Sequence, residues 1–172
     1  GGSAIAHTAE LLHKQLAHDF EEMAFSVGIG RFHGGLEGIR QGYIEAVKAL
    51  KLGRPIVGEK GVVHFDELGV FRILSQFHDW NELEDIYKET IGKLVEYDFS
   101  NNSNLVGTLT EYFACNCSLN ETAEKLFIHV NTMKYRLQKI EQLTGLGIHD
   151  AEKRLLLHIG IHIHRIIEAG LY

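Results

Sequence analysis

Hydrophobic positions in the first third of the chain alternate between a spacing typical of helices and one typical of strands. Helical spacing over 9–23 and 36–52 predicts two helices, and short apolar segments at 25–30 and 61–65 predict two strands. Gly53, with the chain's single proline two residues further on, predicts the end of the second helix. A helix that joins two strands is typical of a parallel α/β layer.

A long amphipathic helix is predicted over 80–97, where an apolar stripe runs along a charged segment. The polar stretch 98–104 follows it, is rich in turn-forming residues and predicts a linker. From there the spacing is helical, and it predicts four helices: 105–113, 119–127, about 131–144 and 151–169. Ser118 and Glu121 have the spacing of a capping box, and Asp150 is placed to cap the last helix.

These elements predict a mostly α fold with two different ends. A partial α/β segment is expected at 1–75, a bridging helix with a linker at 76–104, and a C-terminal helix-turn-helix bundle at 105–172. The length of 172 residues suits one domain of ordinary size or two small ones. With 45% apolar and 23% charged residues, the composition is that of a folded globular protein.

The stretch 118–145 has the plan of a helix-turn-helix, in which two short helices are joined by a three-residue turn. Ala123 stands where the two helices are expected to cross, because only a small side chain allows that approach. The predicted core beneath the turn consists of Leu126, Ile128, Met133 and Leu137. Ile140 continues the apolar face of the second helix one turn further.

The opposite face of this second helix is polar, and such side chains reach base edges and phosphates when a helix lies in the major groove. The residues expected to contact bases or phosphates near its N-terminal end are Asn131, Thr132, Lys134 and Tyr135. The residues expected to contact the DNA backbone are His129, Arg136 and Lys139. A polar face that is merely solvated has the same pattern, so periodicity alone leaves that alternative open.

Charge is unevenly distributed along the chain. The formal net charge of −6 lies entirely in 1–104, whereas 105–172 is neutral. Within 131–145 three basic residues stand against one acidic residue, and a local basic patch matters more for phosphate binding than the total charge. No apolar run is long enough for a membrane span. Cys115 and Cys117 are expected to be reduced thiols in a cytoplasmic protein.

Residues in the same region match a known family in order. They are Thr108, Leu109 and Tyr112; Thr122, Ala123 and Leu126; His129 to Thr132; Tyr135 to Leu137; and Gly145, Asp150, Glu152 and Arg154. On these residues, the chain over about 80–168 strongly resembles the C-terminal helix-turn-helix domain of the PucR/CdaR family of bacterial transcriptional regulators. The stretch is more distantly similar to the Fis-type helix-turn-helix, whose turn has glycine where this chain has Phe127.

The first part of the chain looks like the end of the GGDEF-like domain that precedes the helix-turn-helix in the same family. The matching segments are 27–30, 43–50 and 64–69. The active cyclase motif, Gly-Gly-Asp/Glu-Glu-Phe, is absent, because the glycine pair at 34–35 is followed by Leu36 and Glu37. The resemblance therefore implies a regulatory or dimerising scaffold with no catalytic residue, no metal site and no cofactor.

Two other patterns in the sequence resemble chemical sites only in part. His158 and His162 have the i, i+4 spacing of two metal ligands on one helix, but nothing in the sequence brings further ligands to them. Gly28 and Gly30 lack the rest of any known phosphate-binding loop. They are interpreted as glycines that allow the strand to pack closely against the helix over 36–52.

The function expected from the residues and the resemblance together is that of a sequence-specific, DNA-binding transcriptional regulator. A homodimer on a two-part DNA site is expected, because one recognition helix covers little DNA. A small-molecule effector is expected to bind a missing N-terminal domain. Two alternatives stay open: an interaction or dimerisation module that has lost DNA binding, and a degenerate nucleotide cyclase-like enzyme.

Overall fold

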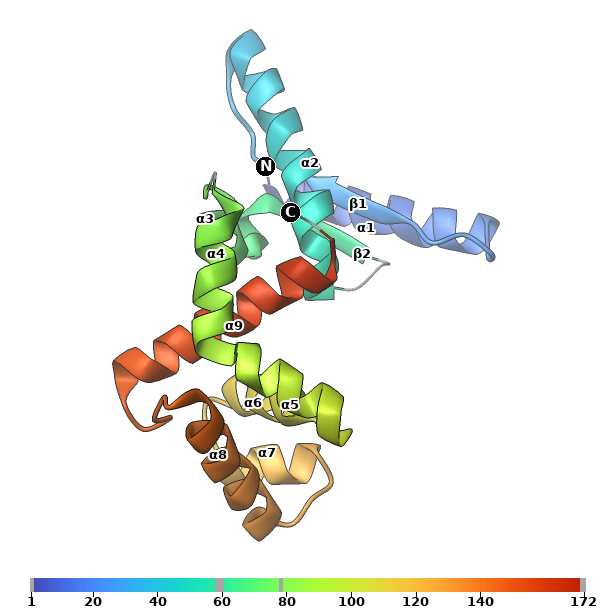
Figure 1. The fold of residues 1–172 in the computed structure, drawn as a ribbon. Coiled ribbons are helices and arrows are strands. Elements are labelled where there is room, and N and C mark those ends of the chain that lie inside the picture. Colours follow the sequence, from blue (N-terminus) through green and yellow to red (C-terminus); the bar gives the residue numbers. More distant parts are fainter. Residues whose placement is uncertain (1, 58–60, 78, 171–172) are drawn as a thin grey trace. The chain divides into compact units, whose positions relative to one another are not determined.

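The computed structural model describes residues 2–57, 61–77 and 79–170 (Figure 1). The chain divides into two compact units, one formed by residues 1–78 with 165–172 and the other by residues 79–164. Helices dominate the described residues, and the strands found among them form one two-stranded sheet. The predicted mostly α fold is therefore confirmed, whereas the boundaries expected near residues 75 and 104 stay predictions.

The first unit is built around a parallel pair of strands. Its elements are α1 (Gly2–Asp19), β1 (Ser26–Ile29), α2 (Gly35–Val57), β2 (Gly61–His64), the 3-10 helix η1 (Phe65–Leu68) and α3 (Val70–Leu74). The two strands pair in parallel from Ser26 opposite Gly61 to Ile29 opposite His64. The strand–helix–strand layer expected from the hydrophobic pattern is therefore confirmed.

Glycines in β1 let α2 lie directly on the strand. A Cβ atom on Gly28 would overlap the carbonyl oxygen of Ala46, and one on Gly30 would overlap that of Gly42. Both carbonyls belong to the backbone of α2, so neither can move aside easily. This confirms that the two glycines serve close packing.

The predicted ends of the first two helices are wrong. α1 begins at Gly2 and ends at Asp19, and α2 runs on to Val57 rather than ending at Gly53. Gly53 is buried, and a Cβ atom there would press on both methyl groups of Val63 in β2. Packing against the strand thus outweighs the low helix propensity of glycine, a tertiary effect that local sequence signals do not contain.

The second unit begins with a long helix that contains one wide turn. α4 (Trp80–Tyr87) leads into a π-helical turn, η2 (Lys88–Gly92), and continues as α5 (Lys93–Asn101). The Thr90 hydroxyl donates to the carbonyl oxygen of Ile86 at 2.6 Å inside this wide turn. The predicted helix over 80–97 is confirmed and extends four residues further.

The polar stretch predicted as a linker is a tight corner between two helices. Residues 98–101 are helical, Asn102 has a left-handed backbone with φ of 48°, and α6 (Leu105–Ala114) follows at once. The Asp98 carboxylate accepts hydrogen bonds from the backbone N–H groups of Leu105 at 2.8 Å and Val106 at 2.9 Å. The turn-forming residues therefore cap α6 instead of forming an extended connection.

Three further helices complete the second unit. They are α7 (Leu119–Lys125), α8 (Val130–Thr144) and α9 (Ala151–Glu168), of which the residues up to His164 lie in this unit. One apolar core joins all of them to α5 and α6, and its fully buried side chains include Ile91, Leu94, Leu109, Met133, Ile140 and Leu157. Within the described ranges, no helix has both the length and the apolar character needed to cross a membrane.

Candidate nucleic-acid interface

α7 and α8 form a helix-turn-helix whose second helix begins at a histidine. The Nδ1 atom of His129 accepts a hydrogen bond from the backbone N–H of Asn131 at 3.2 Å, which caps the N-terminus of α8. Gly145 ends the helix with a left-handed backbone, φ 71°. The helix predicted at about 131–144 is therefore confirmed, and one of the predicted contact residues also serves as its N-cap.

The predicted capping box at the start of α7 is only half formed. The Ser118 hydroxyl oxygen accepts from the backbone N–H of Glu121 at 3.4 Å, as expected. The reciprocal bond is not needed, because the backbone N–H of Ser118 donates to the carbonyl oxygen of Cys115 at 2.9 Å. The preceding turn thus takes the role expected of the Glu121 side chain.

The turn between the two helices closes tightly around Phe127. The N–H of Ile128 donates to the carbonyl oxygen of Ala123, and the N–H of Phe127 donates to that of Glu124, both at 3.0 Å. This pair of bonds is a Schellman motif, which requires a left-handed residue and usually has glycine there. Phe127 takes that conformation with φ of 53°, and its side chain is 95% exposed.

The apolar face of α8 lies in the core, as predicted. Met133, Leu137 and Ile140 are buried, with at most 4% of the side chain exposed. Ala123 is also buried, and Leu126 and Ile128 pack partly buried against the same core. The core therefore holds α8 by its apolar face, and the opposite face of the helix is available for another molecule.

The N-terminal half of α8 presents polar side chains on its exposed face. Asn131, Thr132 and Lys134 are exposed, and the Tyr135 ring is 65% exposed. His129 is exposed immediately before them. These five residues lie together at one end of one helix, which is where helix-turn-helix proteins present the side chains that reach base edges.

Arg136 and Lys139 make contacts inside the unit that the sequence did not reveal. The Nη1 atom of Arg136 donates to the Thr108 hydroxyl oxygen on α6 at 2.9 Å. The Lys139 ammonium lies 4.8 Å from the ring centroid of Tyr97 on α5, at cation–π distance. Both residues thus connect α8 to the helices behind it. Their expected contact with the DNA backbone stays a prediction.

An ion pair connects the first helix of the motif to α6. The Lys125 ammonium lies 2.7 Å from the Glu111 carboxylate oxygen. This hydrogen bond lowers the pKa of Glu111 and raises the pKa of Lys125. Each group favours the charged form of the other, so the pair is charged across the physiological pH range. Because Lys125 is largely exposed, the pair is expected to contribute little to stability.

The histidines of α9 are arranged as a stack. The rings of His158 and His162 lie with their centroids 4.8 Å apart, and that of Phe113 lies 4.6 Å from His158. In the part of the chain that the structure describes, no three His, Cys, Asp or Glu side chains are grouped so that they could hold a metal ion.

Two domain families match this chain. Residues 105–163 match the PucR C-terminal helix-turn-helix domain, and residues 2–52 match the GGDEF-like domain. The first match covers α6 to α8 and most of α9, so it contains the whole motif described above. The second covers α1, β1 and most of α2.

Three relatives of known name are similar along most of the chain. The DNA-binding transcriptional activator AdeR of Bacillus subtilis is 26% identical over 154 residues, which are 89% of this chain and 36% of AdeR. The proline-responsive transcriptional activator PutR of the same organism is 26% identical over 163 residues, 92% of this chain and 40% of PutR. The carbohydrate diacid regulator of Escherichia coli is 30% identical over 148 residues, 84% of this chain and 37% of the regulator. The chain thus spans well under half the length of these curated relatives.

Proposed function

Because the chain belongs, through its PucR-type helix-turn-helix and its GGDEF-like segment, to the PucR/CdaR family of bacterial transcriptional regulators, we propose that it binds duplex DNA through α8 and regulates transcription. The relatives named above are transcriptional activators or regulators. An enzymatic role has no support in these relatives.

One observation carries the proposal: α8 is buried along one side and polar and exposed at the N-terminal half of the other. Met133 is fully buried, whereas its neighbours Thr132 and Lys134 are exposed. A helix fixed to a core in this way fits the major groove of B-form DNA without rearrangement. Four neighbouring side chains of its exposed end combine hydrogen-bonding groups with one positive charge.

The proposed roles follow the chemistry of each exposed side chain. Asn131 and Thr132 read base edges, because amide and hydroxyl groups form directional hydrogen bonds there. Lys134 and His129 approach phosphates, and the Tyr135 hydroxyl donates to a phosphate or base. Arg136 and Lys139 hold α8 in place through their contacts with Thr108 and Tyr97. Contact with the DNA backbone is proposed as a secondary role of these two residues.

The proposed regulator works as a homodimer in the cytoplasm under the control of a small-molecule effector. Two copies of α8 on a two-part site read enough base pairs for specificity, which one copy does not. Control by an effector is supported by the name of one relative, a proline-responsive activator. The effector is proposed to bind outside the helix-turn-helix, as expected for a separate sensing domain.

The test is fluorescence anisotropy of a labelled mixed-sequence duplex titrated with this chain over a series of salt concentrations. Binding is expected to weaken steeply with salt, because phosphate contacts release counterions. Lys134→Ala is expected to weaken binding to all duplexes and to reduce the salt slope by about 1. Lys153→Ala removes an exposed lysine from α9 and serves as the matched control.

Two outcomes contradict the proposal. One is the absence of salt-dependent binding at low salt both by this chain and by a longer protein that contains it. The other is equal weakening by Lys134→Ala and Lys153→Ala, which would place the DNA elsewhere. Retained capture of a protein partner, with no DNA binding, would favour the interaction-module alternative.

A further inference from the structure

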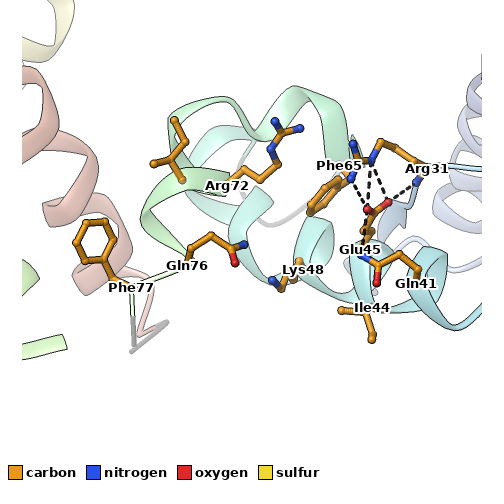
Figure 2. A pocket seen from close by; sticks show the side chains of 10 residues that line it. Arg31, Gln41, Ile44, Glu45, Lys48, Phe65, Arg72, Gln76 and Phe77 are labelled. Carbon is orange, nitrogen blue, oxygen red and sulfur yellow. Dashed lines mark hydrogen bonds and ion pairs between the residues drawn. The ribbon is translucent and has the colours of Figure 1, made fainter. Parts of the chain in front are cut away.

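A cavity of about 630 Å³ lies in the first unit, and none of its lining residues belongs to the helix-turn-helix (Figure 2). One side is formed by α2, from which Gln41 and Lys48 line it. The other is formed by Phe65 of η1, Arg72 of α3 and Gln76 in the turn after α3. The volume falls in the range of small-molecule sites, which run from roughly 300 to 1,000 Å³. All lining side chains belong to one compact unit.

Among the described residues, one carboxylate lines the cavity, and its charge is already neutralised by a partner. Glu45 is 1% exposed, and it accepts hydrogen bonds from the backbone N–H of Arg31 at 2.9 Å and from the Arg31 guanidinium. His33 Nε2 lies 3.0 Å from Glu45 Oε2, the oxygen that also accepts from the backbone N–H of Arg31. The guanidinium holds the pKa of Glu45 at about 2, well below its ordinary value. A bound anion therefore meets no uncompensated negative charge at this position.

The Phe65 ring holds two guanidinium groups at the cavity wall. The Cζ atom of Arg31 lies 5.0 Å from the ring centroid and that of Arg72 lies 5.7 Å from it, while the ring itself is buried. Asp66 lies 3.8 Å from both cations, but its side chain is 56% exposed and does not line the cavity. The planar guanidinium of Arg72 therefore has N–H donors left for a ligand.

Lys48 supplies a second cation to the lining of the cavity. Among the residues that the structure describes, none forms a hydrogen bond or an ion pair with the Lys48 ammonium. Its side chain projects from α2 toward the space below Arg72 and beside Gln76 (Figure 2). The lining thus contains three basic side chains and one carboxylate that is already paired.

This positive lining is local and does not reflect the charge of the surrounding chain. Residues 1–78 contain eight Lys and Arg against nine Asp and Glu, so the segment is close to neutral. A long polyanion such as DNA needs an extended basic surface, whereas these three cations line a single cavity. A compact anion of small size needs only the cavity. Ile44 and Ile73 also line it and offer apolar contact to the rest of such a molecule.

We propose that this cavity binds a small organic molecule carrying two negative charges, a phosphate monoester or a dicarboxylate. Arg72 forms a two-point hydrogen bond with one oxygen pair, and Lys48 neutralises the second charge. The Gln41 amide, which already donates one N–H to Glu45 at 3.4 Å, offers its second N–H to the remaining oxygens, and so does the Gln76 amide. The Arg31–Glu45 pair shapes the wall and does not itself need to bind the ligand. The site would give the first unit a sensing role of its own, independent of whether α8 binds DNA.

The test is isothermal titration calorimetry of the whole chain at low salt with four probes: phenyl phosphate, inorganic phosphate, succinate and phenol. Saturable binding of phenyl phosphate or succinate at millimolar concentration, with no binding of phenol, is expected. Stronger binding of phenyl phosphate assigns the phosphate class, and stronger binding of succinate assigns the dicarboxylate class. No saturable binding of either dianion overturns the proposal.

Matched variants locate the binding. Lys48→Gln and Arg72→Gln are each expected to weaken binding of the dianion about tenfold, because each removes one charge-assisted contact. Lys51→Gln removes an exposed cation from the same helix, outside the cavity, and is expected to leave affinity unchanged. Equal loss in all three variants would mean that the dianion responds only to total charge, which also overturns the proposal. Because the heat of ligand binding is measured without DNA, failure here leaves the proposed DNA contact of α8 untouched.

Discussion

Arg136 on the recognition helix α8 donates from Nη1 to the Thr108 hydroxyl oxygen on α6, at 2.9 Å. Thr108 is fully buried, and its hydroxyl donates in turn to the carbonyl oxygen of Asn104 at 2.6 Å. The hydroxyl thus uses its single proton toward the backbone and its lone pair toward the guanidinium. This chain of two hydrogen bonds fixes where α8 lies relative to the N-terminus of α6.

Replacing Arg136 by alanine is expected to lower the free energy of unfolding by about 1–2 kcal/mol, because a hydrogen bond from a charged donor is lost next to a buried oxygen. Urea denaturation followed by circular dichroism measures the change. Lys134→Ala, on the same helix but exposed, is expected to change stability by less than about 0.5 kcal/mol. Equal stability of the two variants would show that the bond to Thr108 contributes nothing.

Phe127 lies in a left-handed conformation without buried contacts that could compensate for it. Phe127→Gly is therefore expected to raise the free energy of unfolding by about 0.5–1 kcal/mol, because glycine adopts this conformation without the Cβ penalty. Gly145→Ala makes the opposite change at the end of α8, where φ is 71°, and is expected to destabilise by about 1 kcal/mol. A loss of stability in Phe127→Gly would show that the exposed ring is held by contacts within the unit.

Gly160 on α9 packs directly against the wide turn of the preceding long helix. A Cβ atom at this position would overlap the Thr90 hydroxyl oxygen and lie 3.2 Å from the Ile91 Cγ2 atom. Gly160→Ala is expected to destabilise by about 1–3 kcal/mol through overpacking, as measured by thermal or urea unfolding. The same change in a Thr90→Ala background is expected to be milder, because the nearest atom has been removed. Purely additive effects of the two substitutions would contradict a direct clash.

Acid is expected to destabilise the first unit through Glu45. The pKa of Glu45, about 2, lies below the ordinary value of 4.5. Its ionised form therefore adds to the free energy of unfolding above pH 4.5, and this stabilisation is lost as the pH falls toward 2. The lowered pKa corresponds to about 3 kcal/mol of the free energy of unfolding. Urea unfolding at a series of pH values is expected to show this loss in the native chain and a flatter profile in Glu45→Gln. Identical profiles of the two proteins would exclude Glu45 as the source.

The helix-turn-helix was predictable because its determinants are local. The spacing of Met133, Leu137 and Ile140 predicts the buried face of α8, and Gly145 predicts its end. Ala123 is recognisable as the crossing point because the motif has a fixed length. Each of these signals operates within one or two helical turns, so the sequence contains it without knowledge of the fold.

The features that the sequence does not predict depend on partners distant in sequence. The sequence around Gly53 does not predict its contact with Val63. The sequence around Arg136 does not predict its hydrogen bond with Thr108, which is 28 residues away. The cavity lined by Lys48 and Arg72 likewise combines two elements whose packing the hydrophobic pattern does not specify. The error at 98–104 is different in kind. Asn104, directly before α6, is a typical N-cap residue and marks the start of that helix locally, whereas Asp98 reaches the N–H of Leu105 from seven residues earlier in the chain.

The π-helical turn at Lys88–Gly92 determines in which direction around the helix axis the later side chains of the long helix point. An α-helix advances about 100° per residue, so a wide turn that accommodates an additional residue changes which direction the later side chains face. Tyr97 and Asp98 lie beyond it, and they reach Lys139 on α8 and the N-terminus of α6. The orientation of α8 thus depends partly on the number of residues in the π-helical turn. Gain or loss of one position within the turn would misalign both contacts even if every contacting side chain were kept.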